Sequence, residues 1–313
     1  MNQTIDIPEI TEAQAAVATA APASMAVPRL SDRLGDYLEL TKPRMNFLVV
    51  VTTMVGFYLA RGAGDWVLLL NTIVGTWMTA ASAAVLNQLI ERRYDALMPR
   101  TRNRPLPAGR IQPAQALTFG MVLGVGGVAY LSLGVNLLTA ALGLGTLLGY
   151  LLLYTPLKRV TTLNTVIGAV PGAIPPVMGF AAVENTIPTQ AWLLFAILFL
   201  WQMPHFLAIA IMYRDDYAAG GFRMLPVVDR SLHLTGRMII LYTLALIPVT
   251  LLAFPLRMSG AVYVIVAAAL GIAFLAFGIN AMRSRSRVDA RRLFFASVIY
   301  LPLLLAAMMI DKT

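Results

Sequence analysis

Continuous apolar runs near 20 residues in length recur between Leu48 and Ile310 and constrain the fold more than any other feature of the chain. A helix of that length crosses the hydrocarbon layer of a bilayer, whereas a β-barrel would show alternating rather than continuous apolar residues. Only 12% of the 313 residues are charged, which is roughly half the fraction expected of a soluble protein. The sequence therefore predicts an all-α, polytopic membrane protein.

Nine membrane-spanning helices fit the apolar runs. We estimate their bounds as residues 46–61, 66–90, 114–132, 136–154, 162–182, 190–212, 237–255, 259–282 and 293–310. Residues 1–35 have neither the basic start nor the short apolar core of a signal peptide, and their acidic residues are untypical of a mitochondrial transit peptide. We expect a disordered cytoplasmic tail over residues 1–35 and a single membrane domain over residues 36–313.

The basic residues predict the orientation of the chain in the membrane. With a cytoplasmic N-terminus, the cytoplasmic segments hold all of the 24 lysines and arginines except Arg61, Arg257 and Lys312. Such a bias is typical of cytoplasmic loops, and it favours an odd number of spans with the C-terminus on the opposite side. It also accounts for the net charge of +9 without a nucleic-acid partner. The chain has no cysteine, which excludes a thiolate metal site and a cysteine nucleophile.

Residues 87–107 form the most polar stretch of this apolar chain. In a helix, Asn87, Glu91 and Asp95 fall at positions i, i+4 and i+8, on one face and about 12 Å from first to last. Three oxygen-bearing side chains suit a hard cation such as Mg²⁺, and the arginines that follow suit the phosphate or diphosphate that it would carry. The alternative is an ordinary loop whose acids pair with its arginines. A carboxylate at the end of an apolar run is costly and usually functional, which favours the cation site.

A second polar stretch follows the sixth apolar run. Asp215 and Asp216 are either a second cation site that faces the first or the solvated start of a loop. His205 lies inside the apolar run, with Gln202 one turn before it. A lone histidine in a membrane span is a packing residue, a haem-iron ligand or an acid–base group, and its spacing alone leaves these three alternatives open.

Two further basic segments are candidates for anion binding. Lys158 and Arg159 either bind a diphosphate or only determine the topology of the chain in the membrane. Lys42 either binds an anion or is an interfacial anchor before the first span. Glycines and prolines over residues 164–176 are expected to kink the helix that follows. We expect the apolar helices to enclose a chamber above the polar residues 87–107. Irregular backbone at membrane depth is tolerated where it lines a cavity, so we expect Asn164 to line this apolar chamber.

At these motifs the sequence resembles the UbiA-type superfamily of intramembrane prenyltransferases. The first motif of that superfamily is Asn-x-x-x-Asp-x-x-x-Asp, and here its three positions are Asn87, Glu91 and Asp95. The second motif is usually Asp-x-x-x-Asp, and here that spacing falls on Tyr213 and Tyr217 with two aspartates between them. The Trp-Gln-Met-Pro-His-Phe element at residues 201–206 and the Tyr-Arg-Asp-Asp-Tyr element at residues 213–217 resemble the branch that farnesylates haem.

The resemblance covers about residues 36–310 and implies nine helices around a central cavity that opens sideways to lipid. It implies farnesyl diphosphate and haem B as substrates, haem O and diphosphate as products, and Mg²⁺ as the cofactor. It also implies a role for each matching residue. These are catalysis by Asn87, Glu91, Asp95, Asp215 and Asp216, of which all except Asp215 also bind the metal. The others are diphosphate binding by Lys42, Arg102, Arg104, Lys158 and Arg159, haem binding by His205 and Gln202, and cavity walls from Asn164, Tyr213 and Tyr217.

Two other functions remain as alternatives. One is prenylation of an aromatic quinone precursor, against which the His205 element and the tyrosines of the second motif argue. The other is secondary transport, but transporters place their polar site near the middle of the bilayer, whereas these polar clusters lie at one surface. Besides the two substrates and membrane lipid, haem A synthase and a second copy of the chain are candidate partners, and the expected location is a bacterial inner membrane.

Overall fold

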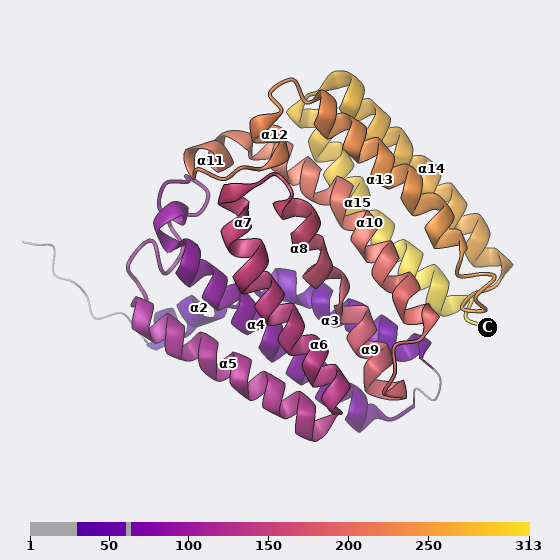
Figure 1. Ribbon diagram of the computed structural model, residues 1–313, viewed down its shortest axis with the longest axis horizontal. Coiled ribbons are helices and arrows are strands. Elements are labelled where there is room, and N and C mark those ends of the chain that lie inside the picture. The colour runs from indigo at the N-terminus through magenta and orange to yellow at the C-terminus, as the bar shows by residue number, and fades with distance from the viewer. Residues whose placement is uncertain (1–29, 61–63) are drawn as a thin grey trace, which may run out of the picture. The chain divides into compact units, whose positions relative to one another are not determined.

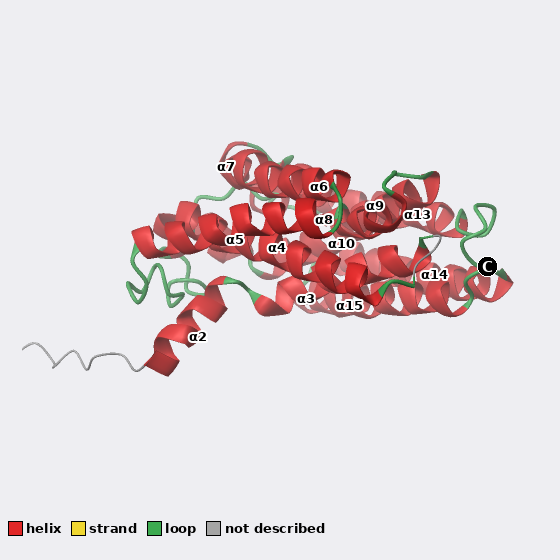
Figure 2. Cartoon of the chain, turned by 90° about the horizontal axis from the view of Figure 1, so that it is seen from below, coloured by secondary structure: helices red, strands yellow, loops and turns green. Residues whose placement is uncertain are grey.

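The structure is a computed structural model that describes residues 30–60 and 64–313. Every regular element within these ranges is a helix (Figure 2). The all-α class predicted from the sequence is confirmed. The chain divides into residues 1–35 and residues 36–313, and the second unit contains every helix from α3 onward. Most of the tail expected over residues 1–35 lies outside the described residues, and residues 30–35 begin helix α2 (Leu30–Leu40).

The remaining helices follow one another with mostly short connections, and Figure 1 labels most of them. Their bounds are α3 (Pro43–Leu59), α4 (Trp66–Asp95), α5 (Pro113–Gly134), α6 (Leu137–Leu148), the π-helical turn η1 (Gly149–Tyr154), α7 (Thr155–Val160), α8 (Asn164–Ala173), α9 (Pro175–Glu184), α10 (Thr189–Met212), α11 (Arg214–Ala219), α12 (Leu225–Val228), α13 (His233–Leu251), α14 (Ala261–Ser284) and α15 (Arg287–Ile310).

Eight helical segments within the described ranges are long and apolar enough to cross a membrane. Two of them are composite, because α6, η1 and α7 run on as Leu137–Val160 and α8 continues into α9 as Asn164–Glu184. The ninth expected span is α3, which is apolar but only 17 residues long. At ~1.5 Å per residue it reaches about 25 Å, the lower limit for a spanning helix. The chain is therefore a polytopic membrane protein.

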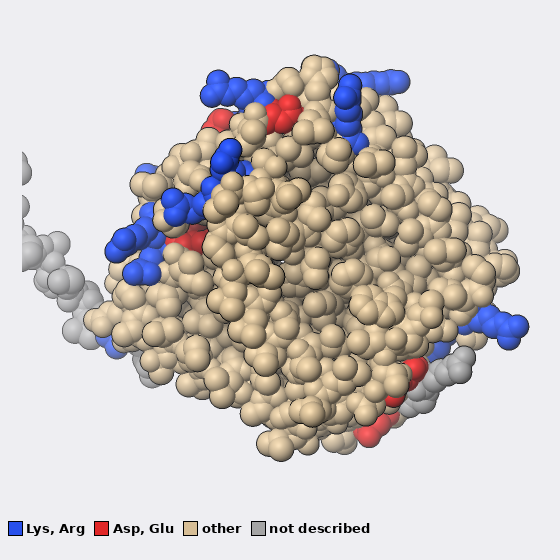
Figure 3. All heavy atoms as spheres, in the orientation of Figure 1, with Lys and Arg blue, Asp and Glu red and all other residues tan. Residues whose placement is uncertain are grey.

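Most of the charged side chains on the face shown in Figure 3 lie along its upper left edge and top, a few lie at the lower right edge, and a broad uncharged surface separates them. Many large apolar side chains of the helices are exposed, including Leu133 at 89% exposure and Leu137 at 76%. In water such exposure would drive association, whereas hydrocarbon lipid accommodates it at little cost.

The ends of several spans differ by up to six residues from those expected, and three of the spans differ in ways that the structure explains. Helix α4 continues to Asp95, five residues beyond the expected end, because the carboxylates of its last turns are buried and paired with basic side chains. The span expected over 162–182 breaks near Ile174, where Pro175 lacks the N–H needed to continue the helical hydrogen bonds and begins α9. The span expected over 136–154 contains the π-helical turn, in which each N–H bonds five residues back.

The packing of α4 against α5 holds the polar end of α4 in place. Small residues line this contact, and a Cβ on Gly124 of α5 would lie 2.7 Å from the Ser82 hydroxyl of α4. The Ser82 hydroxyl also donates a hydrogen bond of 2.7 Å to the Gly120 carbonyl oxygen. Close approach through small residues and a hydrogen bond between helices is typical of membrane helix pairs.

Helices α3 and α9 approach each other as closely as backbone permits. A Cβ on Gly56 would lie 2.0 Å from the Pro176 carbonyl oxygen, and a Cβ on Gly179 would lie 2.2 Å from the Thr53 carbonyl oxygen. Both clashes are with backbone, which cannot swing aside as a side chain can. These glycines therefore fix the position of α3, the helix that follows Lys42.

We expect Gly56→Ala to lower the free energy of unfolding by about 1–3 kcal/mol, the usual cost of an added methyl group in a packed interior. Thermal unfolding of the purified protein in detergent measures the loss. Gly145→Ala in α6 is the control, because its Cβ would meet no atom within 4 Å and alanine favours a helix over glycine. Equal stability of the two variants would show that the α3–α9 contact is not tightly packed.

Candidate functional site

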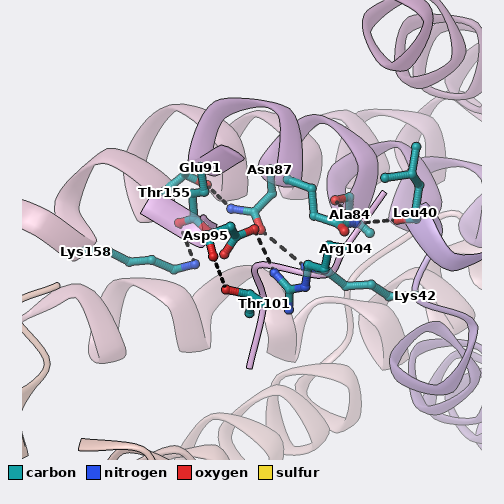
Figure 4. Close-up of polar contacts among 11 residues, drawn as sticks. Leu40, Lys42, Ala84, Asn87, Glu91, Asp95, Thr101, Arg104, Thr155 and Lys158 are labelled. Carbon is teal, nitrogen blue, oxygen red and sulfur yellow. Dashed lines mark hydrogen bonds and ion pairs between the residues drawn. The ribbon is translucent and has the colours of Figure 1, made fainter. Parts of the chain in front are cut away.

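The three oxygen-bearing side chains of α4 lie on one buried face at the end of the helix (Figure 4). Asn87 is 1% exposed, Glu91 is 6% exposed and Asp95 is 1% exposed. The spacing of four residues places them on successive turns, as the sequence predicts for a helix. Buried carboxylates are stable only when paired, so their surroundings must provide compensating charge.

A basic side chain meets each of these three residues (Figure 4). Lys158 Nζ lies 2.8 Å from Glu91 Oε1, and Arg104 Nη1 lies 2.8 Å from Asp95 Oδ2. Lys42 Nζ donates a longer hydrogen bond of 3.4 Å to Asn87 Oδ1. The three cations come from the start of α3, the loop after α4, and α7, so this polar cluster joins segments that are distant in sequence.

The loop after α4 turns back so that Arg104 reaches the helix that precedes it. The Thr101 hydroxyl donates a 2.7 Å hydrogen bond to the backbone carbonyl of Asp95, and Met98 is buried beneath the loop at 2% exposure. A hydroxyl that bonds a free carbonyl at a helix end is a capping arrangement. It fixes the first turn of the loop and therefore the start of the path to Arg104.

Lys158 is held by residues that the sequence analysis does not select. Its Nζ lies 4.5 Å from the centre of the Tyr154 ring, and this cation–π contact is favourable because the face of an aromatic ring attracts positive charge. Thr155, which is 3% exposed, accepts a 3.1 Å hydrogen bond from Asn87 Nδ2 and donates one of 2.8 Å to the Tyr150 carbonyl. The only indication in the sequence that Tyr154 and Thr155 belong to the site was that these two polar residues end an otherwise apolar run.

Lys42 occupies an uncommon backbone conformation just before α3. Its φ of 49° is in the left-handed region, which a residue other than glycine adopts rarely. Burial, together with the nearby positive charges of Arg104 and Lys158, lowers the pKa of the Lys42 ammonium to about 7. An anion that binds beside Lys42 would favour its protonated form.

The segment after α10 contacts the loop after α4 through cation–π interactions between an arginine and two tyrosine rings. The Arg100 guanidinium lies 4.7 Å from the centre of the Tyr213 ring and 5.7 Å from that of Tyr217. The two tyrosines at the second-motif positions therefore contact an arginine of the first polar loop. The Asp215 carboxylate, which is 80% exposed, pairs with Arg287 at the start of α15 and not with the α4 cluster. No hydrogen bond or ion pair of the Asp216 side chain is found among the described residues.

The structure places several predicted site residues outside this cluster. The Arg102 side chain is exposed and has no hydrogen bond or ion pair among the residues described. Arg159 pairs with the hydroxyl of Tyr94. Asn164, expected to line the chamber, is fully buried, and its amide donates to the carbonyls of Thr161 and Arg223 at 2.5 and 3.1 Å.

The two predicted haem-binding residues lie on α10. Gln202 is 4% exposed and donates a 3.1 Å hydrogen bond to the Leu198 carbonyl. Its side-chain oxygen packs closely against Gly172 of α8, where an added Cβ would lie only 2.1 Å from that oxygen. His205 is part-buried against α15, and its Nδ1 lies 2.7 Å from the Ser297 hydroxyl oxygen.

The donor set on α4 fits a hard cation. Within the ranges described, no cluster of three or more histidine, aspartate and glutamate side chains is arranged to hold a metal. The oxygen donors on this face of α4 are the carboxylates of Glu91 and Asp95 and the amide of Asn87. Two carboxylates and one amide are oxygen ligands of the kind that Mg²⁺ prefers. The basic partners now on these oxygens would be free to contact the anion that accompanies the metal.

The sequence matches the model of the UbiA prenyltransferase family over residues 49–299. Two curated relatives, both named protoheme IX farnesyltransferase, come from Solibacter usitatus and Myxococcus xanthus. The first is 47% identical over 287 residues, 88% of this chain and 98% of the relative. The second is 46% identical over 278 residues, 88% of this chain and 94% of the relative.

Solved structures share the fold at low sequence identity. A digeranylgeranylglyceryl phosphate synthase matches with a TM-score of 0.73 at 18% identity, over 90% of this chain and 98% of that one. A UbiA homologue from Archaeoglobus fulgidus, solved with GPP and Mg²⁺ bound, matches with a TM-score of 0.59 at 14% identity, over 87% of this chain and 99% of that one. Together, the helical architecture, the α4 motif and these matches show that the chain belongs to the UbiA prenyltransferase family.

Proposed function

We propose that this protein transfers a farnesyl group from farnesyl diphosphate to a vinyl group of haem B, with addition of water, and so forms haem O and diphosphate. The observation that carries the proposal is the α4 cluster, in which Asn87, Glu91 and Asp95 each face a basic side chain. The choice of haem as the acceptor is supported by the relatives named protoheme IX farnesyltransferase, which this chain matches over nearly their whole length.

Asn87, Glu91 and Asp95 would hold Mg²⁺, which supplies Lewis-acid neutralisation of the departing diphosphate. The homologue from Archaeoglobus fulgidus that was solved with GPP and Mg²⁺ supports the use of a divalent metal in this fold. Asp216 has no partner of its own among the described residues and is our candidate for a further metal ligand from the second polar loop.

The charge of the site suits a metal–diphosphate substrate. With Lys42 protonated, the two carboxylates and three cations carry a net charge of +1. A prenyl diphosphate with three negative charges and one Mg²⁺ carries a net charge of −1, so the filled site would be neutral. Lys42, Arg104 and Lys158 would donate to diphosphate oxygens as negative charge develops on the leaving group, and such preorganised donors stabilise a transition state.

The apolar helices beyond the cluster would accommodate the farnesyl tail. An allylic cation reacts readily with water, so its formation requires a site from which bulk water is kept away. The cluster lies at the end of α4, whose preceding turns are buried among apolar and small residues such as Ala81, Ala84 and Val85. We place the reacting carbon between these turns and the three cations.

We further propose that the protein lies in a bacterial inner membrane with its N-terminus in the cytoplasm and its C-terminus on the other side. The gathering of lysines and arginines at the end that carries the α4 cluster supports this orientation, because cytoplasmic ends of membrane proteins are enriched in them (Figure 3). Water-soluble farnesyl diphosphate would then enter from the cytoplasm. Haem A synthase, as the consumer of haem O, and a second copy of the chain remain candidate partners.

The direct test is a product analysis of the purified protein in lipid or detergent with Mg²⁺, farnesyl diphosphate and either haem B or 4-hydroxybenzoate. We expect mass spectrometry to find a haem product that carries one farnesyl group and one water. A prenylated benzoate instead would assign the protein to quinone-precursor synthesis. If neither acceptor reacts although both substrates bind, the proposal is refuted.

We expect Asp95→Asn and Glu91→Gln each to lower kcat/KM for farnesyl diphosphate by at least about 100-fold, because each removes a charged metal ligand from a buried site. Asp65→Asn is the matched control at the other end of the same helix. Asp65 caps α4 by accepting hydrogen bonds from the N–H groups of Val67 and Leu68, and asparagine caps equally well. Full turnover by Asp95→Asn would exclude this carboxylate from catalysis.

The two arginines of the first polar loop are expected to differ. Arg104→Ala removes a cation that lies 2.8 Å from Asp95 and leaves a buried carboxylate unpaired, so kcat/KM should fall by roughly 10–1,000-fold. Arg102→Ala removes an exposed side chain without such a partner, and we expect a loss of less than about three-fold. Steady-state kinetics of both variants measures the two losses in kcat/KM. Equal losses would show that both arginines bind the diphosphate.

A further inference from the structure

The contact between α10 and α15 contains an arrangement that the diphosphate site does not explain. Ser297 of α15 contacts two side chains of α10 that lie one turn apart, Trp201 and His205. The backbone carbonyl of Ser297 accepts a 2.9 Å hydrogen bond from the Trp201 indole, and its hydroxyl oxygen lies 2.7 Å from His205 Nδ1. Ser297 is fully buried and Trp201 is 3% exposed. Ser297 therefore holds the two aromatic side chains through two different atoms, its carbonyl oxygen and its hydroxyl oxygen.

The single hydroxyl proton of Ser297 determines the protonation of the histidine. Ser297 Oγ lies 2.5 Å from the carbonyl oxygen of Phe294, which can only accept a hydrogen bond. Two oxygens this close need a proton between them, so the serine donates to Phe294 and offers a lone pair to His205. Nδ1 must then carry the ring proton and donate it to Ser297. Nε2 of the neutral imidazole keeps its free electron pair.

Aromatic rings fix the plane of this imidazole. The Trp201 ring stacks on the His205 ring with centroids 4.9 Å apart and planes 23° apart. The rings of Phe294 and Phe206 lie at 5.1 and 5.6 Å from that of His205. No described residue forms a hydrogen bond with Nε2. The imidazole is therefore oriented through Nδ1, whereas Nε2 has no hydrogen-bond partner in the part of the chain that the structure describes.

We infer that Ser297 is a positioning residue that holds His205 with Nε2 unprotonated, as a ligand for the iron of the haem acceptor. The inference rests on the proposed function, because it takes haem as the acceptor. Histidines that bind a metal almost always donate their other ring N–H to an oxygen acceptor, which fixes the tautomer and makes the ligand more basic. The Ser297 hydroxyl has this role here. The two substrates would then be held by different helices, since the diphosphate residues come from α4, α7 and the segments beside them.

Titration of the purified protein with haem in the absence of farnesyl diphosphate tests the inference. Ser297→Ala removes the acceptor of the Nδ1 proton but keeps the carbonyl that holds Trp201. We expect haem binding, followed at the Soret band, to weaken by about 10-fold or more. We also expect the iron–histidine stretching band of the ferrous complex in resonance Raman spectra to shift to lower frequency. Ser297→Thr keeps a hydroxyl and should restore both values, and His205→Ala should abolish the band.

Ser259→Ala is the matched control. Ser259 is a buried serine that likewise donates to a helix carbonyl, that of Met308 at 3.2 Å, without contact to a histidine. We expect it to bind haem as the wild type does. Ser297→Cys, which keeps the size of the side chain but is a weak acceptor, is a second variant should Ser297→Ala fail to fold, and it should show the same loss.

The inference is overturned if both the affinity and the iron–histidine band of the Ser297 variants equal those of a wild-type protein that forms farnesylated haem. It is also overturned if the band persists in His205→Ala. A wild-type protein that forms no farnesylated haem but shows a band dependent on His205 and Ser297 would refute the proposed function and support the haem ligand. The two proposals therefore fail separately.

Discussion

The burial of two carboxylates at the end of an apolar helix is the constraint on which the arrangement of the site depends. An unpaired carboxylate in such surroundings costs several kcal/mol, so Glu91 and Asp95 must each have a cation. Their partners, Lys158 and Arg104, stand 67 and 9 residues away in sequence. The two ion pairs therefore determine where α7 and the loop after α4 can lie. The positions of these two segments relative to α4 follow from the need to neutralise two charges.

The same pairing explains how one set of residues can serve an empty site and a filled one. In the empty site the cations compensate the carboxylates, and in a filled site the carboxylates would compensate a metal while the cations contact its anion. When the substrate binds, these side chains would then exchange one set of oppositely charged partners for another. Rigid packing between α4 and α5 keeps the carboxylates in place during that exchange, because small residues allow the two helices to contact closely.

The sequence was sufficient for the features that depend on local spacing. The interval of four residues placed Asn87, Glu91 and Asp95 on one face, and the apolar runs located the ends of the spans to within six residues. It was insufficient where a partner is distant. Thr155 contacts Asn87 across 68 residues, and no local pattern reports such a contact. The pairing of Asp215 with Arg287 across 72 residues likewise took that carboxylate away from the predicted cation site.

The π-helical turn at Gly149–Tyr154 lies immediately before the threonine and lysine that contact α4. Such a turn contains one residue more than an α-helical turn of the same height, and each residue turns the chain by about 100° around the helix axis. The direction in which Lys158 points is thus set by a count of residues rather than by the identity of any one of them. Loss of a single residue from this turn would leave composition, hydropathy and helix length almost unaltered. It would nevertheless rotate the lysine from the carboxylate of Glu91 toward a neighbouring helix or the lipid.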